Sequence, residues 1–173
     1  MTTRWGAPMD GGFTEYATTR AAWLRKVAYL LCGDWHRADD LVQSAITRLY
    51  TNWHRARRAD NLDGYARRTL VNTFLAEQRT SWWRRVDLRQ NDQDPPAPGS
   101  DVELALDLRA ALERLPARQR ATVVLRYFCD LPVADTARAL GCSEGTVKSQ
   151  TAKAVDTLRE LLREPVRIPE GRP

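Results

Sequence analysis

The sequence has few of the residues that build metal and thiol sites. Its 173 residues include three cysteines and two histidines. Cys32, Cys129 and Cys142 are scattered and form no C-x-x-C pair, so the sequence predicts buried thiols in a reducing compartment. His36 and His54 have no ligand partner at metal spacing. We therefore expect no metal site and no bound cofactor.

Catalytic motifs are absent from the sequence as well. There is no glycine-rich phosphate loop and no nucleophile motif. Neighbouring acids such as Asp39 and Asp40 diverge by about 100° around a helix, so they do not converge on one site. The sequence therefore indicates a protein that is not an enzyme, without catalytic residues.

Long apolar runs and strand patterns are missing too. No apolar stretch reaches the length of about 20 residues that a membrane span needs, and no secretory signal is visible. We expect a cytoplasmic protein without membrane insertion. Strand-like alternation is absent and helical periodicity recurs along the chain, so the predicted fold class is all-α.

Lysine is scarce, with 3 residues against 24 arginines, and the net charge is +5. A basic chain of this kind favours an acidic partner. The charge is uneven: residues 1–86 carry +6, residues 87–102 carry −3, and residues 103–163 carry +2. The most basic part therefore lies in the N-terminal half.

Composition divides the chain into two helical parts. Helical periodicity predicts helices over roughly 13–32, 35–53 and 62–83, with Asp34 as N-cap of the second and Asp60 or Asn61 as cap of the third. Further helices are expected at about 102–114 and 117–129, the latter opened by Pro116. Pro, Gly, Asp, Asn and Gln dominate the segment between the parts, which is typical of a flexible linker. We predict two small helical domains with these bounds: first domain 1–86, linker 87–101, second domain 102–164, tail 165–173.

The segment 133–162 has the pattern of a helix-turn-helix. Gly141 can adopt the left-handed conformation that ends one helix, and Ser143 can cap the next. One stripe of the second helix must face the protein: Val147, Thr151, Ala154, Val155, Leu158, Leu161 and Leu162. The opposite face carries Gly145, Thr146, Ser149, Ala152 and Lys153, flanked by Lys148 and Gln150. Such a face suits phosphates and base edges, and the alternative is an ordinary solvated helix.

Two other polar surfaces lie in the N-terminal half. The helix at 35–53 has a polar face, which is either a solvated surface or a docking surface for a protein: Asp39, Asp40, Gln43, Thr47 and Arg48. The segments 53–61 and 79–85 combine arginine with tryptophan, which is the chemistry of single-stranded nucleic-acid binding. Alternatively, Trp82 and Trp83 pack on the core and the arginines only solubilise the chain. We favour nucleic-acid contact because adjacent tryptophans on a helix point about 100° apart.

Three motifs in this order resemble the extracytoplasmic-function group of sigma-70-type RNA polymerase sigma factors. Residues 38–43 read ADDLVQ, which matches the A-[ED]-D-L-V-Q signature of region 2. Residues 115–120 read LPARQR and resemble the opening of region 4, and residues 143–149 read SEGTVKS, similar to the start of its recognition helix. The segment 65–83 is similar to the SigE-like branch of actinobacteria.

The resemblance implies a role for each polar surface. The 35–53 helix would dock on the clamp helices of the polymerase β′ subunit through Asp39, Asp40, Gln43 and Thr47. The loop 54–63 and the following helix would hold a flipped base and the melted strand of the −10 element, through Arg55, Arg57, Arg58, Asn61, Asn72, Arg79, Trp82 and Trp83. The recognition helix would read the −35 element, through Ser143, Thr146, Lys148, Ser149, Gln150 and Lys153. The rest of that domain would bind the β flap, and the linker would let the domains span the promoter.

Two positions depart from the family pattern. Members often carry Arg where Gln150 stands and Asp where Ala76 stands. Because Gln pairs with adenine better than with guanine, a −35 sequence taken from other members is not carried over to this chain.

The function implied is therefore a sigma factor that binds core RNA polymerase, directs it to −35 and −10 elements and promotes DNA melting. The resemblance leaves an anti-sigma factor open as a further partner, and we expect the free chain to be a monomer. The alternative is a stand-alone helix-turn-helix repressor or activator that binds duplex DNA. Such a regulator needs neither the ADDLVQ face nor the arginine and tryptophan chemistry, and it would concentrate its charge on the DNA-reading helix. An interaction adaptor without DNA is disfavoured by the recognition-helix face.

Overall fold

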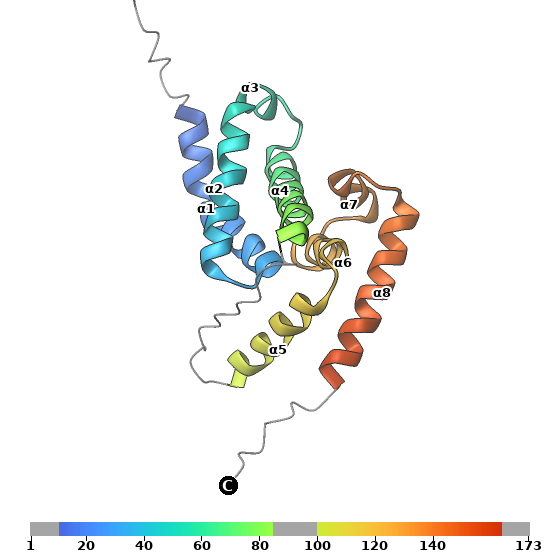
Figure 1. Ribbon diagram of the computed structural model, residues 1–173. Helices are drawn as coiled ribbons and strands as arrows, with labels where there is room; N and C mark the ends of the chain where they lie inside the picture. Colours follow the sequence, from blue (N-terminus) through green and yellow to red (C-terminus); the bar gives the residue numbers. More distant parts are fainter. Residues whose placement is uncertain (1–10, 85–99, 164–173) are drawn as a thin grey trace, which may run out of the picture.

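All secondary structure in the described part of the chain is helical, as predicted (Figure 1). A computed structural model describes the backbone of residues 11–84 and 100–163, and the side chains of residues 12–80 and 107–163. The elements in chain order are α1 (Gly11–Cys32), α2 (Trp35–Thr51), α3 (Trp53–Ala56), α4 (Leu62–Arg84), α5 (Ser100–Arg114), α6 (Ala117–Val123), a π-helical turn η1 (Val124–Phe128), α7 (Val133–Leu140) and α8 (Glu144–Arg163).

The N-terminal helices form a small bundle in which α1 and α2 run side by side and α4 packs against both (Figure 1). Gly33 ends α1 with φ +74°, a value that favours glycine. Asp34 then caps α2, because its side chain accepts a hydrogen bond from the Arg37 backbone N–H at 2.8 Å. The Asp34 cap was predicted. The bundle is closed by fully buried side chains from all three helices: Val27, Leu31, Leu41, Leu49, Leu70 and Phe74.

The C-terminal helices contain the predicted helix-turn-helix in α7 and α8. Gly141 ends α7 in the left-handed region, at φ 61° and ψ 43°. Ser143 caps α8, since its Oγ accepts from the Thr146 backbone N–H at 3.1 Å. The helix expected at 117–129 is interrupted, because α6 gives way to the π-helical turn η1 at Val124. A local hydrophobic pattern does not distinguish the two hydrogen-bond spacings.

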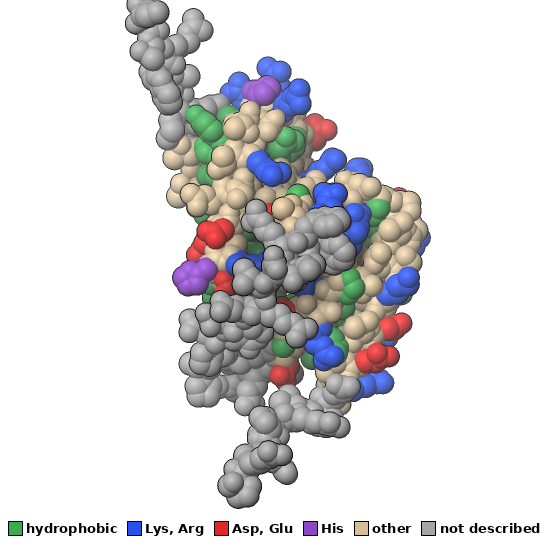
Figure 2. Space-filling view, in the orientation of Figure 1, with side chains coloured by type: hydrophobic (Ala, Val, Ile, Leu, Met, Phe, Trp, Pro, Cys, Tyr) green, Lys and Arg blue, Asp and Glu red, His purple; other side chains and the backbone are tan. Residues whose placement is uncertain are grey.

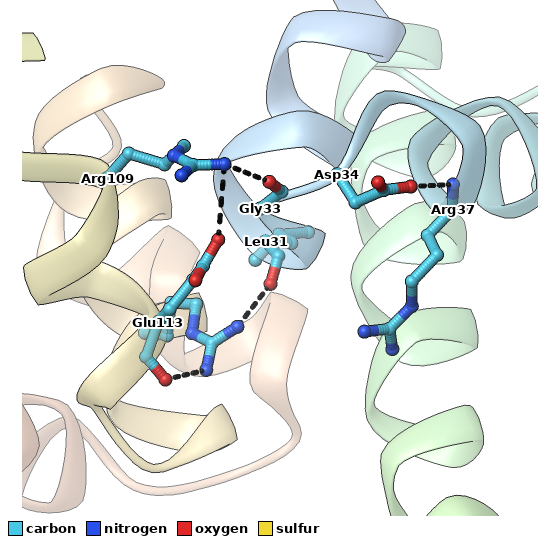
Figure 3. Close-up of polar contacts among 7 residues, drawn as sticks. Leu31, Gly33, Asp34, Arg37, Arg109 and Glu113 are labelled. Atoms are coloured by element: carbon cyan, nitrogen blue, oxygen red, sulfur yellow. Dashed lines mark hydrogen bonds and ion pairs between the residues drawn. The ribbon is translucent and has the colours of Figure 1, made fainter. Parts of the chain in front are cut away.

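The two helical units contact each other around the C-terminal end of α1 (Figure 3). Arg109 Nη1 donates to the Gly33 carbonyl at 2.7 Å, and Arg120 Nη1 donates to the Leu31 carbonyl at 2.6 Å. The last carbonyls of a helix lack intrahelical partners and attract cations, so these arginines satisfy the end of α1. Apolar side chains continue the contact: Ala121, Val124, Leu125, Ala139 and Leu140 belong to the same buried cluster as the α1, α2 and α4 core.

The division into two domains remains a prediction. Most of the expected linker, 87–101, and the expected tail, 165–173, lie outside the described residues. Helix α5 begins at Ser100, two residues before the predicted start at 102.

Candidate nucleic-acid and polymerase interfaces

The predicted docking residues share one exposed face of α2. Asp39, Gln43 and Thr47 are exposed and spaced by four residues, so they follow one another along the helix, with the exposed Asp40 beside them. The opposite face is buried and holds α2 in the bundle through Ala38, Leu41, Val42, Ala45 and Leu49. The helix is thus fixed on one side and free to meet a partner on the other.

The two adjacent acids on this face have different surroundings. Arg25, on α1, binds Asp39 with two roughly parallel hydrogen bonds, Nε to Oδ1 at 2.5 Å and Nη2 to Oδ2 at 3.1 Å. This hydrogen bonding lowers the pKa of Asp39 and raises that of Arg25, so the pair stays charged. Asp40 makes no ion pair within the described residues. Asp39 is therefore held in place, whereas Asp40 is available.

Trp35 lies next to this pair, one helical turn before Asp39. Its ring stacks on Tyr29 with a centroid separation of 3.9 Å and an interplanar angle of 10°. The Arg25 guanidinium carbon lies 4.3 Å from the Trp35 ring centroid, yet Trp35 remains 42% exposed. Sequence reasoning missed both Trp35 and Arg25. The four-residue spacing between Trp35 and Asp39 could have pointed to Trp35. No local signal pointed to Arg25.

A basic surface covers the end of the bundle formed by α3 and the loop after it. Arg55, Arg57 and Arg58 are exposed there, and Figure 2 shows positively charged side chains gathered over this end. The short helix is anchored by the buried Trp53, whose ring meets Phe13 edge-on at 5.3 Å between centroids. Arg55, Arg57 and Arg58 are therefore exposed on a segment that the buried Trp53 anchors to the bundle.

Asn61 and the exposed face of α4 continue this surface. Asn61 caps α4, since its Oδ1 accepts from the Gly64 backbone N–H at 2.8 Å. Asn72 and Arg79 are both exposed, and so is Arg68, which precedes Asn72 by one turn and was missed in the sequence. At about 100° per residue these three positions share one face of the helix. The side chains of Trp82 and Trp83 lie outside the described side chains.

A cleft of about 250 Å³ separates this surface from the helix-turn-helix. Asn61, Tyr65 and Arg68 line one side, and Asp135 and Arg138 of α7 line the other. Part of the predicted −10 surface therefore faces the C-terminal unit across this cleft.

The face of α8 that was predicted to read DNA is exposed at Lys148, Ser149 and Lys153. Val147 and Ala154, on the opposite side, are fully buried and fix the helix on its own domain. The expected inward position of Leu162 is wrong, because this residue is 47% exposed. Leu162 is the second-last residue of α8, so a helical period alone did not show that this end of the helix is exposed.

Two predicted −35 residues take part in a helix cap, and a third is half-buried. Ser143 and Thr146 share a hydrogen bond at 2.9 Å between their hydroxyl oxygens, as part of the α8 cap. Gln150 is half-buried, and its Oε1 is enclosed without a hydrogen-bond partner in the described part of the chain. The exposed lysines are therefore more accessible to DNA than these side chains are.

Comparison with known proteins identifies the family. A model of "Sigma-70 region 2" matches residues 17–84, and a model of "Sigma-70, region 4" matches residues 105–158. The chain is 38% identical to RNA polymerase sigma-E factor of Streptomyces coelicolor, over 87% of this chain and 85% of the relative. It is 34% identical to the extracytoplasmic-function sigma factor SigM of Mycobacterium tuberculosis, over 80% of this chain and 71% of the relative. The chain belongs to the extracytoplasmic-function group of sigma-70 factors.

Two solved structures have the same fold. The sigma factor RpoE from Bartonella quintana, crystallised with the anti-sigma factor NepR, matches with a TM-score of 0.74 and 26% identity, over 88% of this chain and 97% of that one. CnrH, in complex with the cytosolic domain of CnrY, matches with a TM-score of 0.63 at 18% identity, over 88% of both chains. The region 2 match contains the α2 face and the basic surface, and the region 4 match contains the start of α8.

The thiols of this sigma factor are shielded. Cys32 is buried, and Cys129 and Cys142 are half-buried. Burial raises the pKa of the Cys32 thiol to about 11, and that of the Cys129 thiol also to about 11. Within the residues that the structure describes, no three His, Cys, Asp or Glu side chains come together as metal ligands would. None of the described helices is both long enough and apolar enough to cross a membrane.

Proposed function

We propose that this sigma factor binds core RNA polymerase, directs it to promoters through −35 and −10 elements, and promotes melting of the DNA. It acts in the cytoplasm as a non-catalytic initiation factor. The observation that carries the proposal is the presence, in one chain, of an acidic helix face and two separate cationic faces, each on an element anchored by its buried side. A repressor needs only one of these faces.

The exposed α2 face is the polymerase-docking surface in this proposal. Asp40 supplies a carboxylate without an ion pair among the described residues, and Asp39 supplies one held by Arg25. Gln43 and Thr47 extend the face along the helix. Complementary charge both orients an encounter and speeds it. The expected partner surface is the clamp helices of β′.

The basic surface on α3, the following loop and α4 is the −10 reader. Arginine pairs with phosphate through its planar fork, and Asn61 and Asn72 offer amide groups to exposed bases. A flipped base costs a few kcal/mol to extrude, which stacking and hydrogen bonds must offset. Trp82 and Trp83 remain the candidates for stacking.

The α8 face is the −35 reader. Lys148 and Lys153 contact phosphates, Ser143, Thr146 and Ser149 lie at the groove, and Gln150 requires a rotation of its side chain to reach a base. The C-terminal unit also exposes Tyr127 and Phe128, at 61% and 45%. These aromatics are our candidates for contact with the β flap.

An anti-sigma factor is a further partner in this proposal. The support is the likeness to the Bartonella quintana sigma factor, which was crystallised with its anti-sigma factor. Such a partner would compete with core polymerase for the free, monomeric chain.

Binding of the purified chain to core polymerase and to duplex promoter DNA tests the proposal. We expect binding to core polymerase without DNA, and sequence-specific DNA binding only by the complex. Tight, specific binding of the chain alone to duplex DNA, with no affinity for core polymerase, would establish the repressor or activator instead. Asp40→Asn should weaken core binding about thirtyfold or more, because truncating a hot-spot side chain costs about 2 kcal/mol or more.

A further inference from the structure

Four side chains form a connected cluster beside the predicted docking residues. Arg25 and Tyr29 extend from adjacent turns of α1, and Trp35 and Asp39 from adjacent turns of α2. The Arg25 guanidinium contacts both α2 residues: it binds the Asp39 carboxylate through two nitrogens and lies 4.3 Å from the Trp35 ring centroid. Tyr29 stacks on Trp35 at 3.9 Å. We name these residues the Arg25 cluster.

Folding stability does not account for the order of the Arg25 cluster. The side chains of Arg25 and Asp39 are 45% and 50% exposed. Exposed ion pairs contribute little to stability, because solvent screens them and two long side chains must be immobilised. The same immobilisation is useful for binding, because an ordered side chain has less entropy to lose when a partner arrives.

Trp35 extends the docking face by one turn. Trp35, Asp39, Gln43 and Thr47 are spaced by four residues and all are exposed. A tryptophan that is supported by its neighbours and still partly exposed has the properties of a binding hot spot, since aromatic anchors dominate protein interfaces. Arg25 offsets the charge of Asp39, and Asp40 gives the docking face an acidic side chain that no described cation pairs with, which suits a basic partner surface.

We propose that Trp35 is an aromatic contact of the polymerase-docking face and that Arg25 is the positioning residue that holds Trp35 and Asp39 in binding geometry. The inference rests on the proposed function, because the partner is core RNA polymerase. Asp40 is the free carboxylate that pairs with a cationic group of the partner, and Asp39 is fixed before the partner arrives.

Loss of Arg25 has two opposite effects on binding, which makes the inference sharp. Removing a positive charge makes the α2 face more acidic, and charge alone would then strengthen attraction to a basic partner. Removing the positioning group frees Asp39 and one side of Trp35, which weakens binding. We expect the second effect to exceed the first, because salt screens exposed charges over about 8 Å at physiological ionic strength.

The test is the affinity of single variants for core polymerase, measured without DNA at physiological salt. Arg25→Gln and Trp35→Ala should each raise the Kd by about threefold to tenfold. Arg25→Lys keeps the charge but loses the planar fork, so it should not restore wild-type affinity. Arg20→Gln is the matched control, because Arg20 is on the same helix, is also 45% exposed, and pairs with Asp63 of α4 at 2.7 Å instead of with α2.

A double-mutant cycle separates positioning from a plain structural role. If Arg25 acts through Asp39, Arg25→Gln should weaken binding less in the Asp39→Asn background than in the wild-type chain, with the remaining loss due to Trp35. The thermal midpoint of each variant should stay close to that of the wild-type chain, as an exposed pair predicts. Arg25→Lys replaces Arg25→Gln in the cycle if the latter lowers the midpoint.

Three results would overturn the inference: wild-type or tighter binding by Arg25→Gln, an equal loss in Arg20→Gln, or additive losses in the cycle. The proposed function fails separately, when the wild-type chain does not bind core polymerase at all. A third outcome is weaker binding by Asp40→Asn with unchanged binding by Arg25→Gln and Trp35→Ala. This outcome would support the docking face and show that the Arg25 cluster is not part of it.

Discussion

Lys148 and Lys153 are exposed cations on the face of α8 that was predicted to read DNA. Both are exposed on α8, whereas Ser143 and Thr146 are used in its cap and Gln150 is half-buried. Phosphate contacts fix the register of a reading helix, and base contacts determine its sequence preference. The lysines should therefore affect the affinity for −35 DNA more than the preference for a particular −35 sequence.

Lys153→Ala should weaken promoter binding by the polymerase complex about equally on related −35 sequences. Because one phosphate contact is lost, the slope of log affinity against log salt should fall by about 1. Titration of a labelled promoter at several salt concentrations measures the slope. Arg163→Ala is the control, since Arg163 is an exposed cation in the last turn of α8. The same slope for both variants would contradict a phosphate contact by Lys153.

The shielded thiols give a second residue-scale prediction. Burial raises the pKa of Cys32 and of Cys129 to about 11, so both stay protonated at neutral pH and alkylate slowly. Iodoacetamide at pH 8, followed by peptide mass spectrometry, should modify Cys142 first. Equal rates at Cys32 and Cys142 would show that the end of α1 opens readily.

The same pKa shift affects stability at high pH. Burial raises the pKa of the Cys32 thiol from about 9 in the unfolded chain to about 11 in the folded one. The thiol therefore contributes its full share of folding stability below pH 9, and this share is lost as the pH rises through about 11. Replacement of Cys32 by Ala should therefore flatten the fall in thermal midpoint between pH 9 and 11.

At the scale of elements, the turn of the helix-turn-helix depends on one backbone conformation. Gly141 has φ +61°, and a Cβ added there would meet no atom within 4 Å. Gly141→Ala should therefore be destabilising by about 1 kcal/mol through backbone strain alone. Gly145 lies inside α8 with only Ser143 Oγ near an added Cβ, at 3.8 Å, so Gly145→Ala should stabilise by up to about 1 kcal/mol.

Thermal unfolding of the two glycine variants measures this contrast. The midpoint should fall for Gly141→Ala and rise for Gly145→Ala, by a few degrees each. Equal shifts in the same direction would mean that the glycines act through their flexibility in the unfolded chain.

Most elements could be predicted from the sequence because their ends carry local signals. Asp34, Asn61 and Ser143 make the hydrogen bonds expected of caps, and Gly141 has the expected conformation. Contacts between elements could not be predicted in the same way. Arg25 and Asp39 are 14 residues apart, and Arg120 and Leu31 are 89 apart, and no periodicity connects such positions.

At the scale of the whole molecule, Arg120 connects the two helical units. Figure 3 includes the hydrogen bonds to the Leu31 carbonyl and, at 2.7 Å, to the Glu113 carbonyl. A further bond at 3.1 Å goes to the Leu115 carbonyl. Arg120 lies in the LPARQR segment, which resembles a family motif. That motif did not predict the contact of Arg120 with α1. The position of one unit on the other therefore had to come from the structure.

Arg120→Met should lower the free energy of unfolding by about 2 kcal/mol, because hydrogen bonds from a charged donor contribute about 1.5–3 kcal/mol and the carbonyls lose their partner. Urea unfolding measures the change. Arg114→Met is the control, since Arg114 is exposed in the last turn of α5. A loss of the same size in Arg114→Met would show that Arg120 has no special place between the units.

Promoter-dependent transcription tests the central claim, that the three faces belong to one sigma factor, most directly. Run-off transcription with core polymerase on a genomic promoter library should give new, discrete start sites only when this protein is added. The DNA upstream of those sites should share two elements, at −35 and −10. No new transcripts, together with tight binding of the protein alone to duplex DNA, would contradict the account.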